Sequence, residues 1–200
     1  LEEAGDVTPA TDLRPAGGLR VMYIGNLETY QGIDLLLQAF ALACHELAGL
    51  SLTVVGGTDD TIRRYRAEAA SLGIADQVEF TGPRPVGELA RYMAAADILA
   101  SPRTQGENTP MKIYSYLESG KPVLATRLPT HTQVLHDDIA ALASAAPEAY
   151  ALALVDLARD ETRRAELGRA ARAYVREHHS YASFSRTLAG LYDDLGAGRK

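Results

Sequence analysis

The sequence predicts an α/β domain built on a doubly wound parallel sheet of about six strands. Short apolar runs of strand length alternate with helical segments along nearly the whole chain. Strands that are separated by helices in this way indicate right-handed crossovers, with helices covering both faces of the sheet. The length of 200 residues fits one ordinary domain with tails.

Six apolar runs have the length and composition of buried strands. The first run is followed by Gly25, the second by Gly56-Gly57 and the third by a turn at Thr81–Pro83, and such residues are typical of strand ends. The last of the six runs is the weakest. The predicted strands are Leu19–Ile24, Ser51–Val55, Val78–Phe80, Ile98–Ala100, Pro122–Thr126 and Ile139–Ala143. Together with the helices between them, they indicate a Rossmann-like fold.

Apolar residues recur at helical spacing between these runs. Asp59 or Asp60 is expected to cap the second helix. Thr109 is expected to cap a later helix that Pro110 opens. The predicted helices cover Ile33–Leu47, residues 59–72, Val86–Ala95, residues 110–119, and Pro147 to about Leu195 with a break near residues 178–183.

Composition and charge argue against several classes of function. The net charge of -6 argues against a nucleic-acid binder, which would show a basic patch. The single cysteine, Cys44, falls on an apolar helical stripe and is interpreted as a core residue. No apolar run is long enough to cross a membrane, and the N-terminus does not resemble a signal peptide, so the cytoplasm is the expected location.

The chain is expected to be a piece of a larger protein. It begins with Leu1 rather than Met, and residues 5–18 are rich in Pro, Ala, Thr and Gly. We therefore assign residues 1–18 to a linker or tail and residues 19–195 to one ligand-binding domain.

The loop from Ser101 to Thr109 is the most informative segment, because doubly wound sheets bind ligands beyond the carboxyl ends of their strands. This loop supplies Glu107 and enters a helix whose first turn carries Lys112. A helix N-terminus attracts anions, so Lys112 would add charge for a phosphate, and Glu107 would bind hydroxyls of an attached neutral group. The alternative is that Glu107 only balances the helix dipole and that Lys112 is an ordinary solvated lysine.

Five motifs in order resemble the retaining, nucleotide-sugar-dependent glycosyltransferases of family 4, whose GT-B fold consists of two Rossmann-like domains. The likeness extends from about Leu19 to the C-terminal helices. It implies that the chain is the C-terminal, donor-binding domain and that the N-terminal acceptor domain is absent from it. The matching segments are Gly25–Leu36, Val78–Gly82, Ser101-Pro102, Glu107 and Gly120–Thr126.

The resemblance implies roles for residues by position. Glu107 matches the first glutamate of the family's Glu-x7-Glu motif and would be the catalytic residue, contacting hydroxyls of the donor sugar. The nucleobase would lie against Thr81, Gly82 and Arg84, and the ribose at Ser115. The residues expected at the sugar and the diphosphate are Gly25, Asn26, Gln31, Arg103, Asn108, Thr109, Met111, Lys112 and Ile113.

Three positions that are charged in the family are neutral here. Ser115 replaces the second motif glutamate, and Asn26 and Gln31 replace an arginine and a lysine that face the diphosphate. Cations at such positions stabilise a leaving diphosphate. Either Arg103 and Lys112 supply the missing charge from the helix-entry loop, or the site no longer transfers a sugar.

Other candidate positions receive structural interpretations. Glu118 faces another side of its helix than Ser115 and is not expected to replace the missing glutamate. The Gly56–Asp60 segment is interpreted as a strand-to-helix turn, and Thr130–Gln133 as a turn that either caps a helix or meets the donor. His178-His179 lacks carboxylate or cysteine companions at metal-ligand spacing, so no zinc site is expected.

The resemblance also implies a final helix that crosses back onto the N-terminal domain. Its apolar face would consist of Tyr181, Phe184, Leu188, Leu191 and Tyr192. Part of that face would have lost its partner in this chain.

The predicted function is the donor-binding part of a glycosyltransferase that transfers a sugar from a UDP- or GDP-sugar, with retention and without a metal or cofactor. The isolated domain is not expected to complete a reaction, and any peripheral membrane association would come through the absent domain. Two alternatives stay open: a nucleotide-sugar epimerase of the same fold, and a non-catalytic module that binds a nucleotide or a sugar. A nicotinamide-dependent dehydrogenase is disfavoured, because the first strand and helix lack the glycine fingerprint.

Overall fold

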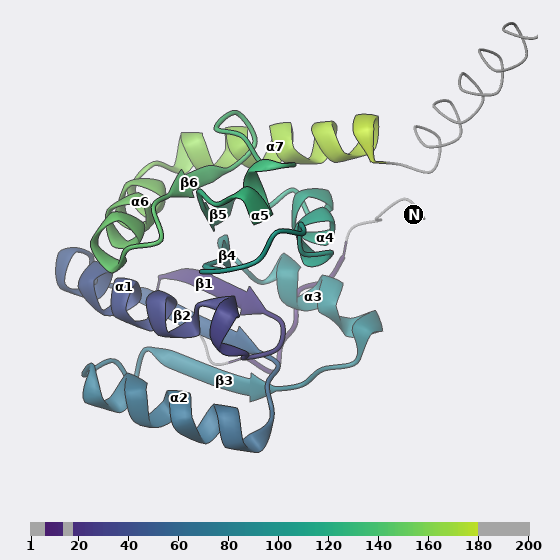
Figure 1. Cartoon of the computed structure of the whole chain (residues 1–200). Coiled ribbons are helices and arrows are strands. Elements are labelled where there is room, and N and C mark those ends of the chain that lie inside the picture. Colours follow the sequence, from purple (N-terminus) through teal and green to yellow (C-terminus); the bar gives the residue numbers. More distant parts are fainter. Residues whose placement is uncertain (1–6, 14–17, 180–200) are drawn as a thin grey trace, which may run out of the picture.

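A computed structural model describes residues 7–13 and 18–179 of the chain and confirms the predicted Rossmann-like α/β fold. Six parallel strands form one sheet in the order β3-β2-β1-β4-β5-β6 (Figure 1). The strand order reverses between β1 and β4, which creates the crevice where such sheets bind ligands. The strands are β1 Leu19–Ile24, β2 Leu50–Val55, β3 Val78–Gly82, β4 Ile98–Ser101, β5 Val123–Thr126 and β6 Ala141–Ala143.

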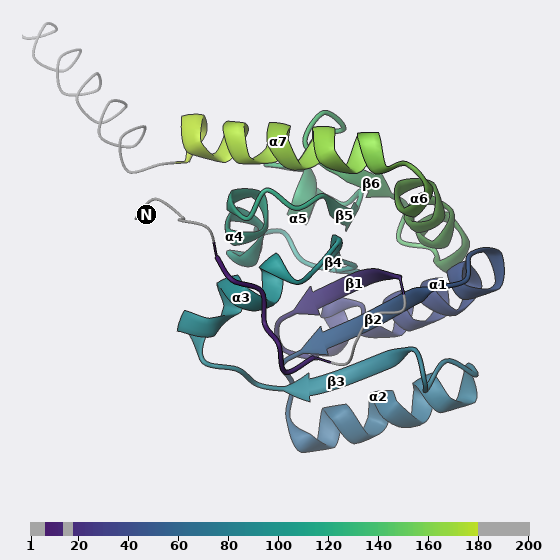
Figure 2. The same ribbon diagram turned by 180° about the vertical axis from the view of Figure 1, so that it is seen from behind.

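Helices cover both faces of the sheet, as Figures 1 and 2 show from opposite sides. The first face carries α1, α2 and α6, and the second carries α3 and α4. Helix α7 contributes to the cores on both faces. The helical elements are η1 Thr29–Gln31, α1 Ile33–Glu46, α2 Asp59–Ser71, η2 Val86–Glu88, α3 Leu89–Ala94, α4 Lys112–Glu118, α5 Pro129–Thr132, α6 Pro147–Arg159 and α7 Glu161–His178.

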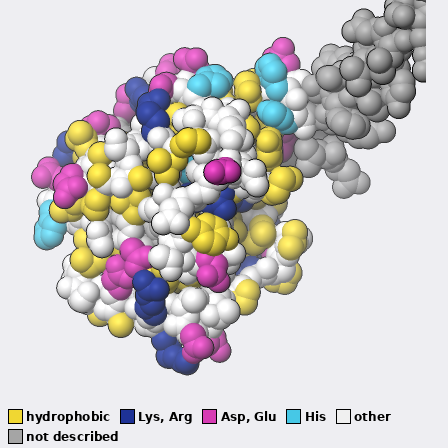
Figure 3. Space-filling view, viewed as in Figure 1, with side chains coloured by type: hydrophobic (Ala, Val, Ile, Leu, Met, Phe, Trp, Pro, Cys, Tyr) yellow, Lys and Arg dark blue, Asp and Glu magenta, His cyan; other side chains and the backbone are white. Residues whose placement is uncertain are grey.

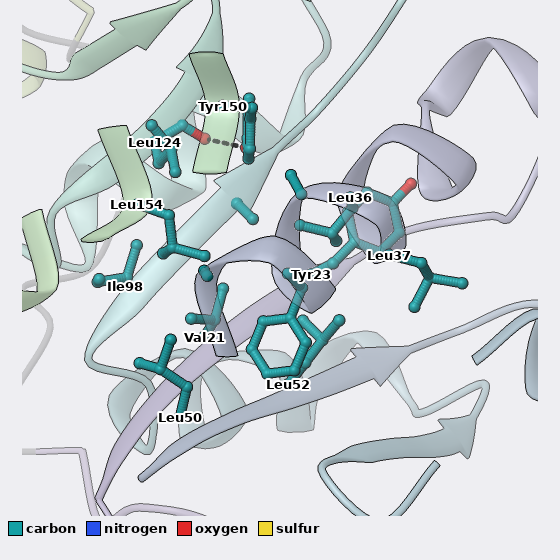
Figure 4. Packing of buried hydrophobic residues seen from close by; sticks show 14 of the residues in the cluster. Val21, Tyr23, Leu36, Leu37, Leu50, Leu52, Ile98, Leu124, Tyr150 and Leu154 are labelled. Carbon is teal, nitrogen blue, oxygen red and sulfur yellow. Dashed lines mark hydrogen bonds between the residues drawn. The ribbon is translucent and has the colours of Figure 1, made fainter. Parts of the chain in front are cut away.

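Strand β1 divides the apolar core into two halves through the alternation of its side chains. Val21 and Tyr23 pack under α1, α2 and α6, whereas Met22 and Ile24 pack under α3 and α4. Figure 4 shows the first half, where the Tyr150 hydroxyl donates to the carbonyl oxygen of Leu124 at 2.9 Å. Because both faces of the strand are buried, it is apolar along nearly its whole length.

Helix α7 fixes the position of α4 through backbone contact and ion pairs. A Cβ atom on Gly168 of α7 would lie 2.1 Å from the carbonyl oxygen of Gly120, so only glycine allows this approach. Glu118 of α4 lies 3.0 Å from Arg176 and 3.9 Å from Arg172, both on α7. These contacts turn Glu118 away from the carboxyl edge of the sheet, in agreement with the sequence interpretation.

Two predicted helix caps are wrong. Helix α2 is capped by Thr58 rather than by Asp59 or Asp60, because Thr58 and Thr61 form a reciprocal capping box. Helix α4 begins at Lys112 and lacks a side-chain cap, so Thr109 does not cap it. Instead, the Thr109 hydroxyl donates to the side-chain oxygen of Gln133 at 3.4 Å.

The C-terminal helical region divides at Asp160, a break that the sequence analysis missed. The Asp160 carboxylate accepts a hydrogen bond from the N–H of Arg163 at 2.8 Å and so caps α7. Helix α7 then ends at His178, within the break that was predicted near residues 178–183. The face predicted for a final helix, Tyr181 to Tyr192, lies outside the described residues.

Replacing Gly168 with Ala is expected to destabilise the domain. Alanine favours a helix over glycine by about 1 kcal/mol, but its Cβ would meet the Gly120 carbonyl at 2.1 Å. Such overpacking costs about 1–3 kcal/mol, and backbone atoms cannot yield as a side chain does, so we expect a net loss of stability. Urea unfolding measures this change as a difference in the free energy of unfolding. Gly87→Ala is the matched control, since nothing lies within 4 Å of its added Cβ. Equal or greater stability of Gly168→Ala would contradict this account.

Candidate functional site

Three loops at the carboxyl edge of the sheet are joined by their main chains. The N–H of Gly25, after β1, donates to the carbonyl of Val55 at 3.0 Å, and the N–H of Gly56, after β2, donates to the carbonyl of Gly82 at 2.8 Å. A Cβ atom on Gly56 would lie 2.1 Å from the carbonyl oxygen of Gly25. The predicted positions Gly25 and Gly82 therefore belong to one continuous backbone surface at the edge where ligands of this fold bind.

The side chain of Lys112 reaches this surface from α4. Its Nζ lies 3.9 Å from the centre of the Tyr23 ring and 3.4 Å from Oε1 of Gln31. A Cβ atom on Gly25 would come within 3.3 Å of the same Nζ. The structure thus brings together three predicted residues, Gly25, Gln31 and Lys112, around one ammonium group.

Burial changes the protonation of this ammonium group. Desolvation lowers the pKa of Lys112 to about 7, and the positive charge of Arg103 adds to the effect. Within the described ranges, Lys112 forms no ion pair with a carboxylate. A half-buried cation without a counter-ion is costly, and an anion bound beside it would relieve that cost.

Arg103 provides a second cation on the loop after β4. Its Nη1 donates at 2.9 Å both to the carbonyl of Asn108 and to the hydroxyl of Thr130, and the guanidinium lies 5.0 Å from the centre of the Tyr30 ring. Its buried Nε has no hydrogen-bond partner in the described structure. Arg103 therefore shapes the loop and also adds positive potential next to Lys112.

A buried histidine supports this loop from below. Nε2 of His131 lies 2.9 Å from the Ser101 hydroxyl, and Nδ1 lies 2.9 Å from the carbonyl oxygen of Thr126. The Thr126 hydroxyl donates to the carbonyl of Arg103 at 2.6 Å. Burial lowers the pKa of His131 to about 4, and Lys112 and Arg103 contribute, so the ring is neutral at neutral pH. The imidazole is inaccessible to a ligand and holds the Arg103 backbone in place.

The loop that carries Glu107 is tied down by its backbone. The Gln133 amide donates to the carbonyl of Glu107, and the Thr130 hydroxyl donates to the carbonyl of Asn108 at 2.8 Å. The side chains of Glu107 and Asn108 are exposed. The turn at Thr130–Gln133 therefore positions this loop, and the Glu107 carboxylate points away from the protein interior.

The other predicted residues of α4 differ in their access to a ligand. Met111 is 79% exposed, and Ser115 is exposed. Ile113 is fully buried, and its N–H donates to the carbonyl of Pro110 at 3.0 Å. We therefore correct the prediction for Ile113, whose side chain packs in the core and whose N–H is already paired. Asn26 is exposed on the first loop, where its carbonyl accepts from the Tyr23 hydroxyl at 2.6 Å.

The predicted nucleobase residues lie together at the end of β3 and on the loop that follows it. The Thr81 hydroxyl donates to the carbonyl of Gly82 at 3.0 Å, and that carbonyl also accepts from Gly56. Arg84 is turned toward Tyr92 of α3, which accepts from its Nε at 2.6 Å. The Arg84 guanidinium is therefore occupied by protein groups.

Two tyrosines that support the site were missed by the sequence analysis. Tyr23 lies under the Lys112 ammonium, and the Tyr116 hydroxyl on α4 accepts from the N–H of Ile24 at 2.8 Å. Both side chains are buried, and a buried tyrosine hydroxyl usually has a hydrogen-bond partner. In the sequence, each of these tyrosines stands among apolar residues of a predicted strand or helix. That position was the signal by which a buried, hydrogen-bonded tyrosine could have been predicted.

The other candidate residues in the described part of the chain have structural surroundings. No group of three His, Cys, Asp or Glu residues in this part of the chain could hold a metal ion. Burial raises the pKa of the Cys44 thiol to about 11, which fits its packing against the core. The His178 ring stacks on Tyr174 with centroids 4.4 Å apart.

Two further features concern the nucleic-acid binders and the membrane-crossing segments that the sequence argues against. Basic side chains on the face shown in Figure 3 are scattered and form no continuous stripe. Among residues 7–13 and 18–179, no helix is long and apolar enough to span a membrane.

Comparisons with known proteins identify relatives of this domain. Residues 18–160 match the family model described as "Glycosyl transferases group 1". The D-inositol 3-phosphate glycosyltransferase of Corynebacterium glutamicum is 31% identical over 87% of this chain, but the match spans only 43% of that relative.

Solved structures share the fold at lower identity. HepE of Anabaena, crystallised with UDP, superposes with a TM-score of 0.78 at 20% identity, covering 90% of this chain and 50% of HepE. The C-terminal domain of a group 1 glycosyltransferase, LpcC of Francisella tularensis, superposes with a TM-score of 0.74 at 16% identity. That match covers 88% of this chain and 96% of the LpcC domain.

The lowered pKa of Lys112 can be measured directly. The sequence contains three lysines, so ¹³Cε signals of labelled lysine are few, and Lys112→Met assigns the one of interest. Without ligand, this signal is expected to titrate with a pKa of about 7, because the ammonium is desolvated beside Arg103. Arg103→Met should raise the measured pKa by removing the neighbouring charge. A Lys112 signal that titrates near 10.5 would show that the ammonium is solvated.

Proposed function

Because this chain belongs to the group 1 glycosyltransferases, we propose that it is the domain that binds the nucleotide-sugar donor. The observation that carries the proposal is the pair of cations, Lys112 and Arg103, which lack a carboxylate partner in the described structure. They stand beside the backbone surface of Gly25, Gly56 and Gly82 at the carboxyl edge of the sheet. A diphosphate carries the negative charge that would compensate these two cations.

Lys112 and Arg103 supply the positive charge that Asn26 and Gln31 lack. The 3.4 Å contact between Nζ of Lys112 and Oε1 of Gln31 supports this proposal, since the ammonium reaches the position of the neutral side chain. Gln31 is only 8% exposed, so its amide can orient the ammonium without contacting solvent. During transfer, the cations would stabilise the charge that develops on the departing nucleoside diphosphate.

Glu107 contacts the donor sugar in this proposal. Its loop is fixed by backbone hydrogen bonds from Gln133 and Thr130, while its carboxylate remains exposed. A carboxylate held in this way accepts hydrogen bonds from sugar hydroxyls and orients the anomeric carbon. Transfer would proceed with retention, to an acceptor that another part of the full-length protein binds. The chain alone completes no transfer.

UDP-sugars are the preferred donors in this proposal. The fold is shared with HepE, which was crystallised with UDP, and the loop of Thr81 and Gly82 offers main-chain groups to a base. GDP-sugars remain the second possibility.

A non-catalytic nucleotide-binding module is the second candidate function. Ser115 favours it, because this exposed hydroxyl offers the ribose no carboxylate. Hydrolysis of UDP-sugars by the full-length protein separates the two functions, since a binding module leaves the donor intact.

Calorimetric titration with UDP, GDP and ADP tests donor binding. UDP is expected to bind, and Lys112→Ala should weaken it at least about tenfold, the effect of losing a charge-assisted contact. Lys121→Ala, at an ordinary position after α4, is the control. Unchanged UDP affinity in Lys112→Ala would refute the proposed diphosphate site, and an absence of binding to every nucleotide would refute the donor-binding function.

The sugar contact is tested separately with Glu107→Ala. This variant should bind UDP like the wild type but bind a UDP-sugar less tightly, because only the sugar contacts the carboxylate. The ratio of the two dissociation constants is the measurement. An equal loss for UDP and UDP-sugar would place Glu107 outside the sugar subsite.

Donor affinity should fall as the pH rises above about 7. The pKa of Lys112 is about 7 in the free protein, and a bound diphosphate would raise it by stabilising the ammonium. Above that pH, binding must therefore take up a proton, which costs up to about tenfold in affinity for each further pH unit. Titrations at about pH 8 in buffers of different ionisation enthalpy should report this uptake. Lys112→Met should abolish the uptake, and a wild type that binds without taking up a proton would contradict the mechanism.

A further inference from the structure

Residues 7–13, which were predicted to be part of a linker, lie against α3 (Figure 2). The N–H of Ala10 donates to the carbonyl of Arg91 at 3.0 Å. Leu13 is buried in the same core half as Met22, Ile24 and Tyr92. This segment is therefore an integral part of the second face of the domain.

Near its end, the segment contributes Asp12 to a polar relay of three side chains, Asp12, Tyr92 and Arg84. This relay reaches the loop after β3. The Tyr92 hydroxyl donates to Oδ2 of Asp12 at 2.7 Å and accepts from Nε of Arg84 at 2.6 Å. A second guanidinium nitrogen of Arg84 lies 3.4 Å from the same Asp12 oxygen. All three side chains thus interact with both of the others.

Burial makes Tyr92 the essential member of this relay. Its side chain is 2% exposed, so its hydroxyl depends on protein partners rather than on water. The direct ion pair between Asp12 and Arg84 lies at the surface and contributes little by itself. The hydrogen bond from Tyr92 lowers the pKa of Asp12, which shows that it favours the charged carboxylate.

Arg84 lies two residues beyond Gly82 on a loop that contains Pro83 and Pro85. At Gly82, the loop is bound to Gly56 through a main-chain hydrogen bond of 2.8 Å. At Arg84, it is bound to Asp12 and Tyr92. The path of the loop between these two points is therefore set in part by residues outside the proposed donor site.

We propose that Asp12 and Tyr92 are positioning residues which, through Arg84, hold the loop after β3 in the conformation that binds the nucleobase. Arg84 itself serves as the connection to this relay rather than as a ligand of the base, and the base meets the main chain of the loop. This inference rests on the proposed donor-binding function and adds a determinant of base affinity that lies outside the proposed donor site.

Two variants test the relay. Tyr92→Phe removes both of its short hydrogen bonds and keeps the buried ring, and Asp12→Ala removes an exposed carboxylate. Asp60→Ala is the matched control, because Asp60 forms an exposed ion pair with Arg63 on α2.

Hydrogen exchange and ligand titration supply separate readouts. We expect faster exchange of the backbone amides of residues 81–88 in both variants and unchanged exchange in Asp60→Ala. We also expect UDP affinity to fall about fivefold, because the loop that meets the base is less well ordered without these hydrogen bonds, whereas inorganic pyrophosphate should bind as in the wild type. A purely structural defect would weaken UDP and pyrophosphate alike and lower the melting temperature.

The outcomes distinguish this inference from the function on which it rests. If the wild type binds UDP and both variants bind it equally well, the relay has no role in base binding and the inference is wrong. Equal losses for UDP and pyrophosphate overturn it as well. If exchange is faster in the variants but no nucleotide binds to the wild type, the relay exists, and both the positioning role and the donor-binding function are refuted.

Discussion

The position of α4 over the end of β1 depends on the buried hydrogen bonds between Tyr116 and the main chain of Ile24. The N–H of Ile24 at the strand end donates to the hydroxyl of Tyr116, which is buried between the strand and the helix. Lys112 precedes Tyr116 by one helical turn and so lies on the same side of α4. The contact of Gly168 with Gly120 fixes the other end of the helix. Without this arrangement, the Lys112 ammonium would not reach Tyr23 and Gln31, and the cation pair would not form.

In the proposed donor site, the positive charge comes from α4 rather than from the first loop. Asn26 and Gln31 make the first loop neutral, while Lys112 brings an ammonium to the same place from a different element. The cost is a half-buried cation without a carboxylate partner in the described structure, and its pKa falls to about 7. Binding sites commonly retain such unfavourable groups because a ligand, rather than the fold, compensates them.

The sheet was predictable from sequence because strand periodicity and turn glycines are local signals. The predicted Leu19–Ile24 run coincides with β1, and all six strands are present. The predicted caps at Asp59 or Asp60 and at Thr109 failed, because neighbouring threonine and glutamine side chains offered competing hydrogen bonds. These competitors are as near as Thr58 or as distant as Gln133. The capping box of Thr58 and Thr61 is local to the sequence, whereas only the tertiary structure brings Gln133 to Thr109.

The candidate site was predictable in its main residues but not in their partners. The motif positions identified Lys112, Glu107 and the glycine turns, and these residues lie at one edge of the sheet. The pairing of Arg84 with Asp12 joins residues 72 positions apart in the chain, and no local pattern predicts it. Ile113 was assigned to the ligand by its position in a motif, whereas the burial of its side chain assigns it to the core.

The floor of the proposed donor site, formed where Gly25, Gly56 and Gly82 meet, consists almost entirely of main chain. Substitutions elsewhere alter side chains but leave peptide groups unchanged, so this floor can persist through long divergence. The walls, by contrast, are made of exposed side chains such as Glu107 and Met111, and a substitution there changes the groups that a ligand meets. Under the proposed donor-binding function, substitutions would therefore change the sugar that is accepted more readily than the nucleotide that carries the sugar.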